Sequence, residues 1–409
     1  MARAKKILIG GVPYGYDNLG DEAILACIVD GCRRVCPEAE ITVLTGKPQE
    51  TERRLGVRGI EFLLGEKRGQ FAWSRDLVRA FRDTDLFIWG GANGLSDYPQ
   101  MSLKTVLLAK VLGKKVMLYA VGFDPLRHQF HPNRPWKRWV SRAADTLLGR
   151  PGRFQSFYED VRTGVIRLCL RVVCNRVDLI TVRDSESGAL LREYGVQRPP
   201  LKVTADPTTL LLDGEPDVRP LRALPPADGG GLIGVGISSQ QAPPPAVQKG
   251  FAQALDYLVQ KFGVRILFIP MNPQTDQVLM GEIRERMKEK KKAENLKGGI
   301  TPEELLPTIR RTDLIISSRL HLLIMALVCN VPCVGLSRGG KIDNFLHRIG
   351  LEAAGDVREI DASRFRKACE QTWLDRTRIR ERMWKALGDM REAARKNHVL
   401  LAALLNGGV

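Results

Sequence analysis

The chain has 409 residues, 44% of them apolar, and its 63 Lys and Arg against 46 Asp and Glu give a formal net charge of +17. This length exceeds one ordinary hydrophobic core and suits two domains of about 200 residues each. The positive charge favours an acidic partner, such as a phosphorylated substrate, an anionic membrane surface or a nucleic acid. Because zinc-finger spacing, RNA-binding signatures and aromatic-rich basic ribbons are all missing, no nucleic-acid partner is expected.

The sequence has no uncharged apolar stretch of 18 residues, and its N-terminal apolar run is too short for a signal peptide. We therefore expect a cytoplasmic protein. Among eight cysteines, only Cys27, Cys32 and Cys36 are spaced closely enough to be tested as a metal site. They follow one helix face and no His accompanies them, so buried thiols are favoured over zinc, and no metal is expected.

Residues 1–212 alternate apolar runs with amphipathic stretches, which predicts a first Rossmann-like domain. The expected strands span residues 5–12, 40–45, 84–89, 116–121, 178–183 and 201–205.

Polar side chains follow three of these expected strands. Asn18 and Asp21 lie in the loop after the first strand, and Asn93 and Asp97 lie after the third. Asp21 also falls in the first turn of a predicted helix, where a carboxylate complements the helix dipole, so a capping role is an alternative. Asp206 ends the sixth strand and is followed by a proline, which suits either a general base facing a cleft or a helix cap.

Residues 126–176 are a basic insertion with interspersed Trp and Phe. One interpretation is a solvated basic helical segment. The other is docking on an anionic membrane surface, where basic residues and interfacial aromatics both bind lipid.

Residues 213–231 are rich in Pro, Gly and charge and predict an interdomain linker. Residues 232–374 repeat the alternation of strands and helices and predict a second Rossmann-like domain. In it, residues 281–297 are expected to form a charged surface helix and residues 301–310 a capped helix. Residues 375–409 are expected to form terminal helices that cross back onto the first domain.

Residues 312–347 read as strand, helix, strand, a crossover that gathers polar side chains at one edge. Ser317, Ser318, Arg319 and His321 follow the first strand, whereas Ser337, Arg338, Lys341 and Asp343 follow the second. Helix N-termini at such an edge offer unpaired N–H groups and partial positive charge. The unit therefore predicts a site for a doubly charged anion, although a lone packed His and a solvated Lys are common in proteins.

Several blocks resemble the polysaccharide pyruvyl transferases, the group that pyruvylates bacterial cell-wall polymers. They are S-R-L-H ending at His321, G-x-S-x-x-x-K-I-D ending at Asp343, T-A-D-P around Asp206 and N-x-G-D-E-A from Asn18. The resemblance implies a GT-B-like α/β fold, in which two Rossmann-like domains face a cleft. The N-terminal domain would hold the acceptor and the C-terminal domain the donor.

The resemblance also implies the reaction and its partners. Phosphoenolpyruvate would give its pyruvyl group, as a ketal, to two hydroxyls of one sugar, and phosphate would leave. The expected sugar is an N-acetylmannosamine of a lipid-linked cell-wall precursor, which would bring the enzyme to the inner face of the membrane. No cofactor is expected, because phosphoenolpyruvate is a co-substrate.

The resemblance further suggests roles for individual residues. His321 is expected to be the acid that protonates the donor and Asp206 the base for the hydroxyls. The other expected contacts are donor-binding Arg319, Lys341, Ser317, Ser318 and Arg338, and acceptor-binding Asn18, Asp21, Asn93 and Asp97.

Two alternatives remain at this point. A GT-B glycosyltransferase that uses a sugar nucleotide would hold a diphosphate in the same crevice. A degenerate member that only binds glycan or lipid is suggested by two departures from the family pattern: the loop of residues 93–96, and Ser239, which stands where an Arg is common.

Overall fold

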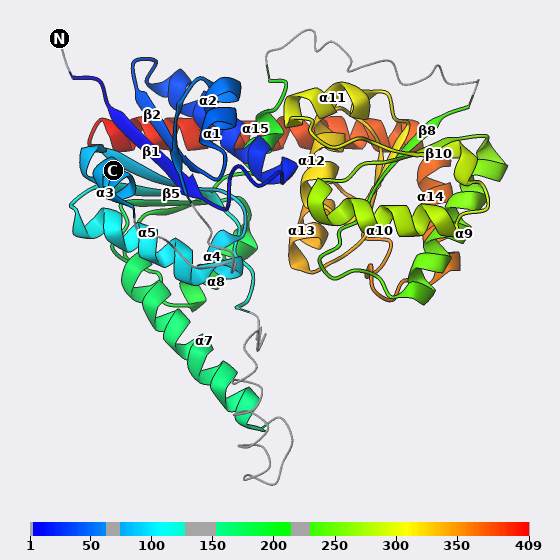
Figure 1. Cartoon of the computed structure of the whole chain (residues 1–409), viewed down its shortest axis with the longest axis horizontal. Helices are drawn as coiled ribbons and strands as arrows, with labels where there is room; N and C mark the ends of the chain where they lie inside the picture. The colour runs from blue at the N-terminus through cyan, green and yellow to red at the C-terminus, as the bar shows by residue number, and fades with distance from the viewer. Residues whose placement is uncertain (1–2, 63–73, 127–152, 214–229, 409) are drawn as a thin grey trace.

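The computed structural model describes residues 3–62, 74–126, 153–213 and 230–408. Most of the predicted linker and about half of the predicted basic insertion lie outside these described residues. The described chain forms two α/β domains, each built on a parallel sheet with helices on both faces (Figure 1). The predicted fold class, two Rossmann-like domains, is confirmed.

Within the described residues, the N-terminal sheet has seven strands in the order β3-β2-β1-β4-β5-β6-β7. The strands are β1 (Lys6–Gly11), β2 (Glu40–Thr45), β3 (Arg58–Glu61), β4 (Leu86–Gly90), β5 (Lys115–Val121), β6 (Leu179–Val182) and β7 (Leu201–Val203). The helices of this domain are α1 (Leu19–Val35), α2 (Pro48–Leu55), α3 (Arg75–Asp83), α4 (Gly94–Asp97), α5 (Pro99–Val111), α7 (Arg153–Cys174), α8 (Ser185–Glu193) and the 3₁₀ turn η1 (Pro207–Leu210). The order reverses beside β1, so the loops after β1 and β4 open at one edge of the sheet.

The C-terminal sheet has five strands in the described part of the chain, in the order β10-β9-β8-β11-β12. The strands are β8 (Leu232–Gly236), β9 (Arg265–Phe268), β10 (Ala293–Asn295), β11 (Leu314–Ser317) and β12 (Cys333–Gly335). Its helical elements are α9 (Pro245–Phe262), α10 (Pro273–Arg286), η2 (Lys290–Lys292), α11 (Pro302–Arg310), α12 (Leu320–Val328), α13 (Gly340–Arg348) and α14 (Ala362–Leu374). Strands β11 and β12 are parallel neighbours, so α12 and α13 begin side by side.

One apolar cluster crosses the boundary between the domains. It joins Leu19 and Ala23 of α1 to nearly all of α12 and to the inner face of α15 (Arg376–Leu405). Helix α12 is apolar almost all round, and every residue except His321 is buried, as expected for a helix enclosed by other elements. The backbone N–H of Leu19 also donates to the carbonyl of Met271 in the other domain at 2.9 Å.

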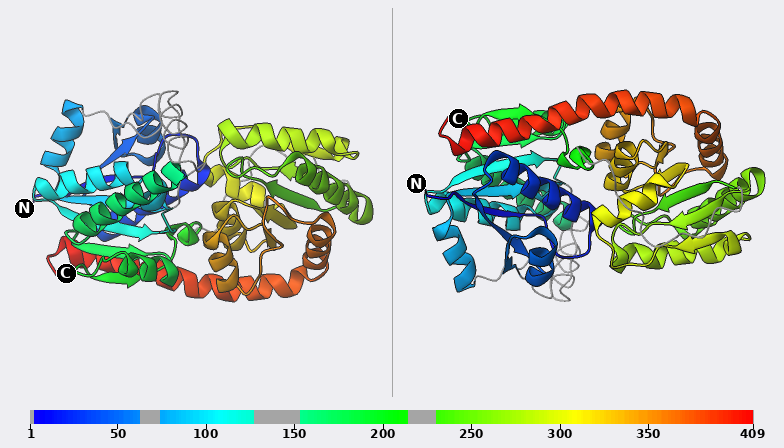
Figure 2. Two further views of the ribbon diagram at one scale, coloured as in Figure 1. Left: turned by 90° about the horizontal axis from the view of Figure 1, so that it is seen from below. Right: turned by 90° about the horizontal axis from the view of Figure 1, so that it is seen from above.

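Helix α15 runs from the C-terminal domain across to the N-terminal domain, as its red ribbon shows in Figures 1 and 2. Its Asn397 is fully buried and accepts from the Thr204 hydroxyl at 3.1 Å, while its amide donates to the carbonyls of Ala205 and Ala394. These bonds tie α15 to the segment that leads into Asp206.

The C-terminal domain confirms one helix prediction and corrects another. Helix α11 begins with Thr301 and Glu304 in a reciprocal capping box, as expected for a capped helix over residues 301–310. The charged helix expected over residues 281–297 is wrong in its second half, because α10 ends at Arg286 and β10 follows. Strand β10 pairs with β9, and this pairing between segments distant in sequence overrides the helical charge pattern. No helix in the described residues has the length and apolar composition to span a bilayer.

Replacing Asn397 by Ala should lower the free energy of unfolding by about 1 to 3 kcal/mol, because the Thr204 hydroxyl and two carbonyls lose a buried partner. Chemical denaturation would measure the loss. Val399→Ala, at a site 69% exposed on the same helix, is the matched control and should change stability by less than about 0.5 kcal/mol. Equal stability of the two variants would contradict a structural role for Asn397.

Candidate functional site

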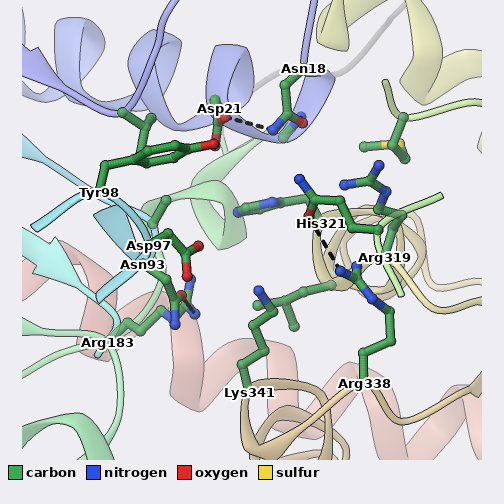
Figure 3. A pocket seen from close by; sticks show the side chains of 16 residues that line it. Asn18, Asp21, Asn93, Asp97, Tyr98, Arg183, Arg319, His321, Arg338 and Lys341 are labelled. Carbon is green, nitrogen blue, oxygen red and sulfur yellow. Dashed lines mark hydrogen bonds between the residues drawn. The ribbon is translucent and has the colours of Figure 1, made fainter. Parts of the chain in front are cut away.

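A hollow of about 690 Å³, part of it open to solvent, lies between the two domains. Eight predicted site residues line it together: Asn18, Asp21, Asn93, Asp97, Arg319, His321, Arg338 and Lys341 (Figure 3). The other lining residues are Val12, Gly20, Ala92, Tyr98, Arg183, Gln240, Met271 and Leu320.

The C-terminal wall of the hollow is built around the starts of two helices. Helix α12 follows Arg319 and α13 follows Gly339, and neither first turn has a side-chain cap. Gly339 has a φ of 123°, a conformation that glycine adopts without strain. Uncapped N–H groups and two helix dipoles therefore favour negative charge at this wall.

Arg338 and Lys341 add positive charge beside these helix starts. Arg338 is buried, and its guanidinium donates to the carbonyl of Ser318 and to the Gln240 side chain, both at 3.3 Å. Burial lowers the pKa of Lys341, and nearby Arg338 and Arg183 lower it further, against opposing carboxylates. Figure 3 shows the Lys341 ammonium reaching into the hollow between the two walls. A bound anion would stabilise the charged form of this lysine.

Arg319 is held by a carboxylate that sequence reasoning missed. Its Nε donates to one oxygen of Asp276 at 3.0 Å, and an amino group donates to the other oxygen. Asp276 is fully buried and also accepts from the Ser239 N–H and hydroxyl and from the Asn272 N–H. Ser239 therefore has a defined role in fixing the partner of Arg319.

Ser317 and Ser318 were expected to bind the donor, but their fully buried side chains support the backbone and do not line the hollow. The Ser317 hydroxyl donates to the carbonyl of Gly236 at 2.9 Å and accepts from the Arg319 N–H at 2.8 Å. Ser318 Oγ accepts from the Ser238 N–H at 2.9 Å. These bonds join the end of β11 to β8 and to the residues that follow β8, whereas Arg319 and His321 reach the hollow.

His321 belongs to the C-terminal domain, but its imidazole lies against the N-terminal domain. Its Nε2 is 3.7 Å from the Oδ2 of Asp206, within ion-pair distance but too far for a hydrogen bond. On the other side it packs on Gly20, where a Cβ atom would come within 2.2 Å of His321 Nδ1. Gly20 thus allows the first turn of α1 to approach the imidazole.

Asp206 lies behind His321, and this corrects the expectation that it faces the cleft as a base. Its Oδ1 accepts from the backbone N–H and the hydroxyl of Thr208, so it caps η1, and its Oδ2 accepts from Arg183 at 3.2 Å. Burial alone would raise the pKa of Asp206, but His321, Arg183 and Thr208 outweigh it and hold the pKa well below its usual range. A strongly ionised carboxylate with both oxygens occupied orients a neighbouring imidazole rather than taking protons from a substrate.

Arg183 extends this network toward the N-terminal wall of the hollow. Besides contacting Asp206, it donates to the Asn93 side chain, and the Asn93 amide donates to Asp124 at 2.6 Å. Asp184, the next residue in the chain, lies farther from the guanidinium, at 3.6 Å. Both ends of the Asn93 amide are therefore bonded inside the protein, so the side chain braces the wall of the hollow.

Asp21 faces the hollow from the first turn of α1. Asn18, the residue before the helix, donates to Asp21 at 2.6 Å, and its side-chain oxygen accepts from the Gly20 N–H. Burial is the main cause that raises the pKa of Asp21 to about 6, and Glu22 adds to it, while His321 and Arg319 oppose. Asn18 is thus the helix cap, and Asp21 is a carboxylate that titrates near neutral pH.

A family model described as polysaccharide pyruvyl transferase matches residues 18–340. The chain belongs to this family. The match covers most of both domains, including the loop at Asn18 and the start of α13. Membership of this family makes the protein a transferase, and the hollow is its candidate active site. No curated protein matches the sequence.

Solved structures with the same fold come from other enzyme groups. S. aureus MnaA in a UDP co-structure has a TM-score of 0.64 at 11% identity, covering 99% of this chain and 97% of that chain. UDP-GlcNAc 2-epimerase from Neisseria meningitidis bound to UDP-GlcNAc has a TM-score of 0.58 at 11% identity, covering 98% of this chain and 100% of that chain. Anabaena HepE in complex with UDP and glucose has a TM-score of 0.55 at 12% identity, covering 99% of this chain and 100% of that chain. At such identities the likeness supports the GT-B-like fold alone.

Sequence reasoning about this polysaccharide pyruvyl transferase missed Asp276, Gln240 and Tyr98. Asp276 could have been suspected from the sequence. It lies in the first turn of α10, and this helix follows the buried strand β9. Tyr98 directly follows Asp97, so the reasoning that placed Asp97 after a strand end applies to Tyr98 as well. No local signal indicates that Gln240 contacts Arg338, since their separation is 98 residues.

The cysteine group predicted to be buried thiols lies on α1 and at its end. Cys27 and Cys32 are buried, and burial raises the pKa of Cys32 to about 12. A thiol with so high a pKa stays protonated and packs as a small apolar group.

Gly20→Ala should lower turnover by roughly a hundredfold, because the new methyl group would displace His321 from its position beside Asp206. Gly281→Ala is the matched control: Gly281 also lies within a helix, and nothing lies within 4 Å of its added Cβ atom. The comparison needs steady-state kinetics and a circular dichroism spectrum of each variant. Full activity of a folded Gly20→Ala enzyme would contradict the close packing of His321.

Proposed function

We propose that this polysaccharide pyruvyl transferase transfers the pyruvyl group of phosphoenolpyruvate to two hydroxyls of one sugar, forming a ketal and releasing phosphate. The observation that carries the proposal is the division of charge across the hollow. Arg338, Lys341 and two uncapped helix starts line one wall, Asp21 and Asp97 line the other, and His321 lies between them. A small dianion next to a hydroxyl-rich sugar matches this division.

The donor would bind the C-terminal wall through its phosphate and carboxylate. Lys341 and Arg338 supply charge there, and the N–H groups at the starts of α12 and α13 supply hydrogen bonds. Arg319 uses its Nε and one amino group for Asp276, so only the other amino group can reach the donor. Its ion pair would keep the guanidinium in one orientation, which favours a preorganised site.

His321 would protonate C3 of the enolpyruvate, which becomes the methyl group of the ketal. This makes C2 electrophilic, and the first sugar hydroxyl would add to C2 as its proton passes to a base. The C2–O bond to phosphate then breaks, the second hydroxyl closes the ring, and its proton leaves with the phosphate. Asp206 would hold the imidazole and stabilise its protonated form.

Asp21 would serve as the base in place of Asp206, because it faces the hollow and titrates near neutral pH. A base whose pKa lies near the working pH is deprotonated in much of the enzyme and still binds a proton well enough to take it from a hydroxyl. Asn18 would orient this carboxylate through its 2.6 Å hydrogen bond.

The acceptor would bind at the N-terminal wall, near Asp97 and Tyr98. The Tyr98 ring offers an apolar face for a sugar, and Asp97 offers oxygens for its hydroxyls. The family resemblance favours N-acetylmannosamine in a lipid-linked precursor. Asn93 would support this wall indirectly, since its amide is already bonded to Arg183 and Asp124.

Phosphate release from phosphoenolpyruvate, measured with a panel of lipid-linked N-acetylhexosamine disaccharides, tests the donor and the acceptor together. We expect release only with an acceptor that contains N-acetylmannosamine, and a product whose mass increases by one pyruvyl ketal. His321→Ala should abolish both signals. An added hexose from a sugar nucleotide would instead support a glycosyltransferase. If none of the acceptors in the panel causes phosphate release, this result would contradict pyruvyl transfer and favour a binding protein.

The pH profile tests Asp21 as the base. Because a protonated carboxyl cannot accept the hydroxyl proton, kcat/KM should fall about tenfold for each pH unit below about 6. Asp21→Asn should lower kcat/KM and remove this acidic limb. Asp17→Asn is the matched control, since Asp17 lies in the same loop but pairs with Lys47 outside the hollow. If the limb persists in Asp21→Asn, it belongs to the donor phosphate and Asp21 is not the base.

A further inference from the structure

Helix α7 carries a second apolar face on its solvent side. Its Val161, Val165, Leu168 and Val172 are 50%, 55%, 60% and 42% exposed. These positions are separated by four, three and four residues, so they form one continuous stripe along the helix. Single exposed apolar residues are common, but four in register on one helix mark an interaction surface.

The opposite face of α7 already packs on the N-terminal domain. Leu170 and Val173 are buried in the same core cluster as Val106 of α5, with Ile166 packed against it. The exposed stripe is therefore not needed to attach the helix to the domain. In Figure 1, α7 leaves the domain at one end and extends away from both sheets.

Arginines flank the stripe on both sides. From residue 160 to residue 176 the chain carries four arginines, Arg162, Arg167, Arg171 and Arg176, against one acid, Asp160. At 3.6 residues per turn, Arg162 lies on one side of the stripe and Arg167 and Arg171 on the other, while Arg176 follows the end of the helix. The guanidinium of Arg167 stacks over the Tyr194 ring, while Arg171 and Arg176 are exposed.

We propose that this outer face of α7 binds an anionic lipid surface, with the stripe inserted among the acyl chains and the arginines at the headgroups. An apolar stripe bordered by cations is the pattern of a helix that lies in the interface of a bilayer. Anionic headgroups complement the arginines, which favours lipid over a second copy of the chain. Two copies of α7 packed stripe to stripe would bring their arginines together, and like charges at that distance repel.

This surface is separate from the hollow and does not depend on the proposed transfer reaction. Binding to vesicles can be measured with no donor and no acceptor, so the lipid proposal and the pyruvyl-transfer proposal fail independently. A membrane-bound enzyme would nevertheless meet a lipid-linked acceptor at the surface where that acceptor lies.

Cosedimentation of the full-length protein with phosphatidylcholine vesicles, with and without phosphatidylglycerol, tests the proposal. We expect binding to the anionic vesicles only, and weaker binding as salt is added, because salt screens the arginines. The double variant Val165→Asp, Leu168→Asp should lower the partition coefficient roughly tenfold or more, since it adds two charges to the inserted face.

Val278→Asp is the matched control, because Val278 is 67% exposed on α10 and lies outside the stripe. It should bind vesicles as the unmodified protein does, and circular dichroism should show that both variants are folded. Failure of the unmodified protein to bind anionic vesicles would overturn the proposal, as would unchanged binding by the double variant. Light scattering adds a third outcome: a dimer that Leu168→Asp dissociates would assign this face to a second copy of the chain and overturn the lipid proposal.

Discussion

The contact between His321 and the N-terminal domain is the interaction on which the site depends. The imidazole comes from α12, yet Gly20 and Asp206 of the other domain hold it on two sides. The two domains must therefore be docked before the hollow has its imidazole in position. An apolar cluster that joins α1, α12 and α15, and the hydrogen bond from Leu19 to Met271, keep them docked.

Two buried ion pairs fix the charged side chains around this contact. Asp276 holds Arg319 in the C-terminal domain, and Asp206 holds Arg183 in the N-terminal domain. A buried charge is costly to desolvate unless a partner and further hydrogen bonds compensate it, and both carboxylates have such bonds. The pairs contribute little net stability, but they hold the guanidinium groups in one orientation. Lys341, Arg338 and the helix starts belong to neither ion pair and can respond to an anion.

Charges of opposite sign line the two walls of the hollow. Arg338, Lys341 and two helix starts lie on the C-terminal wall, where they favour negative ligands. Asp21 and Asp97 lie on the N-terminal wall, whose Arg183 is already paired with Asp206. Asp21 and Asp206 show that their surroundings shift the pKa values of two aspartates in opposite directions. Asp206 is surrounded by donors and stays ionised, whereas Asp21 has fewer donors for its buried carboxylate and its pKa is raised to about 6.

The sequence by itself determined the fold class, because apolar runs of strand length alternate with amphipathic helices throughout both halves. It also determined which loops line the hollow, since residues such as Asn18, Asn93, Arg319 and Lys341 follow strand ends that parallel sheets bring to one edge. Only the tertiary structure decided which way each side chain points and what it contacts. Asp206 turns behind His321 to cap η1, Ser317 and Ser318 turn into the sheet, and Asp276 reaches Arg319 from 43 positions away. Local pattern encodes position along a strand, whereas these pairings form between segments that meet only after the chain has folded.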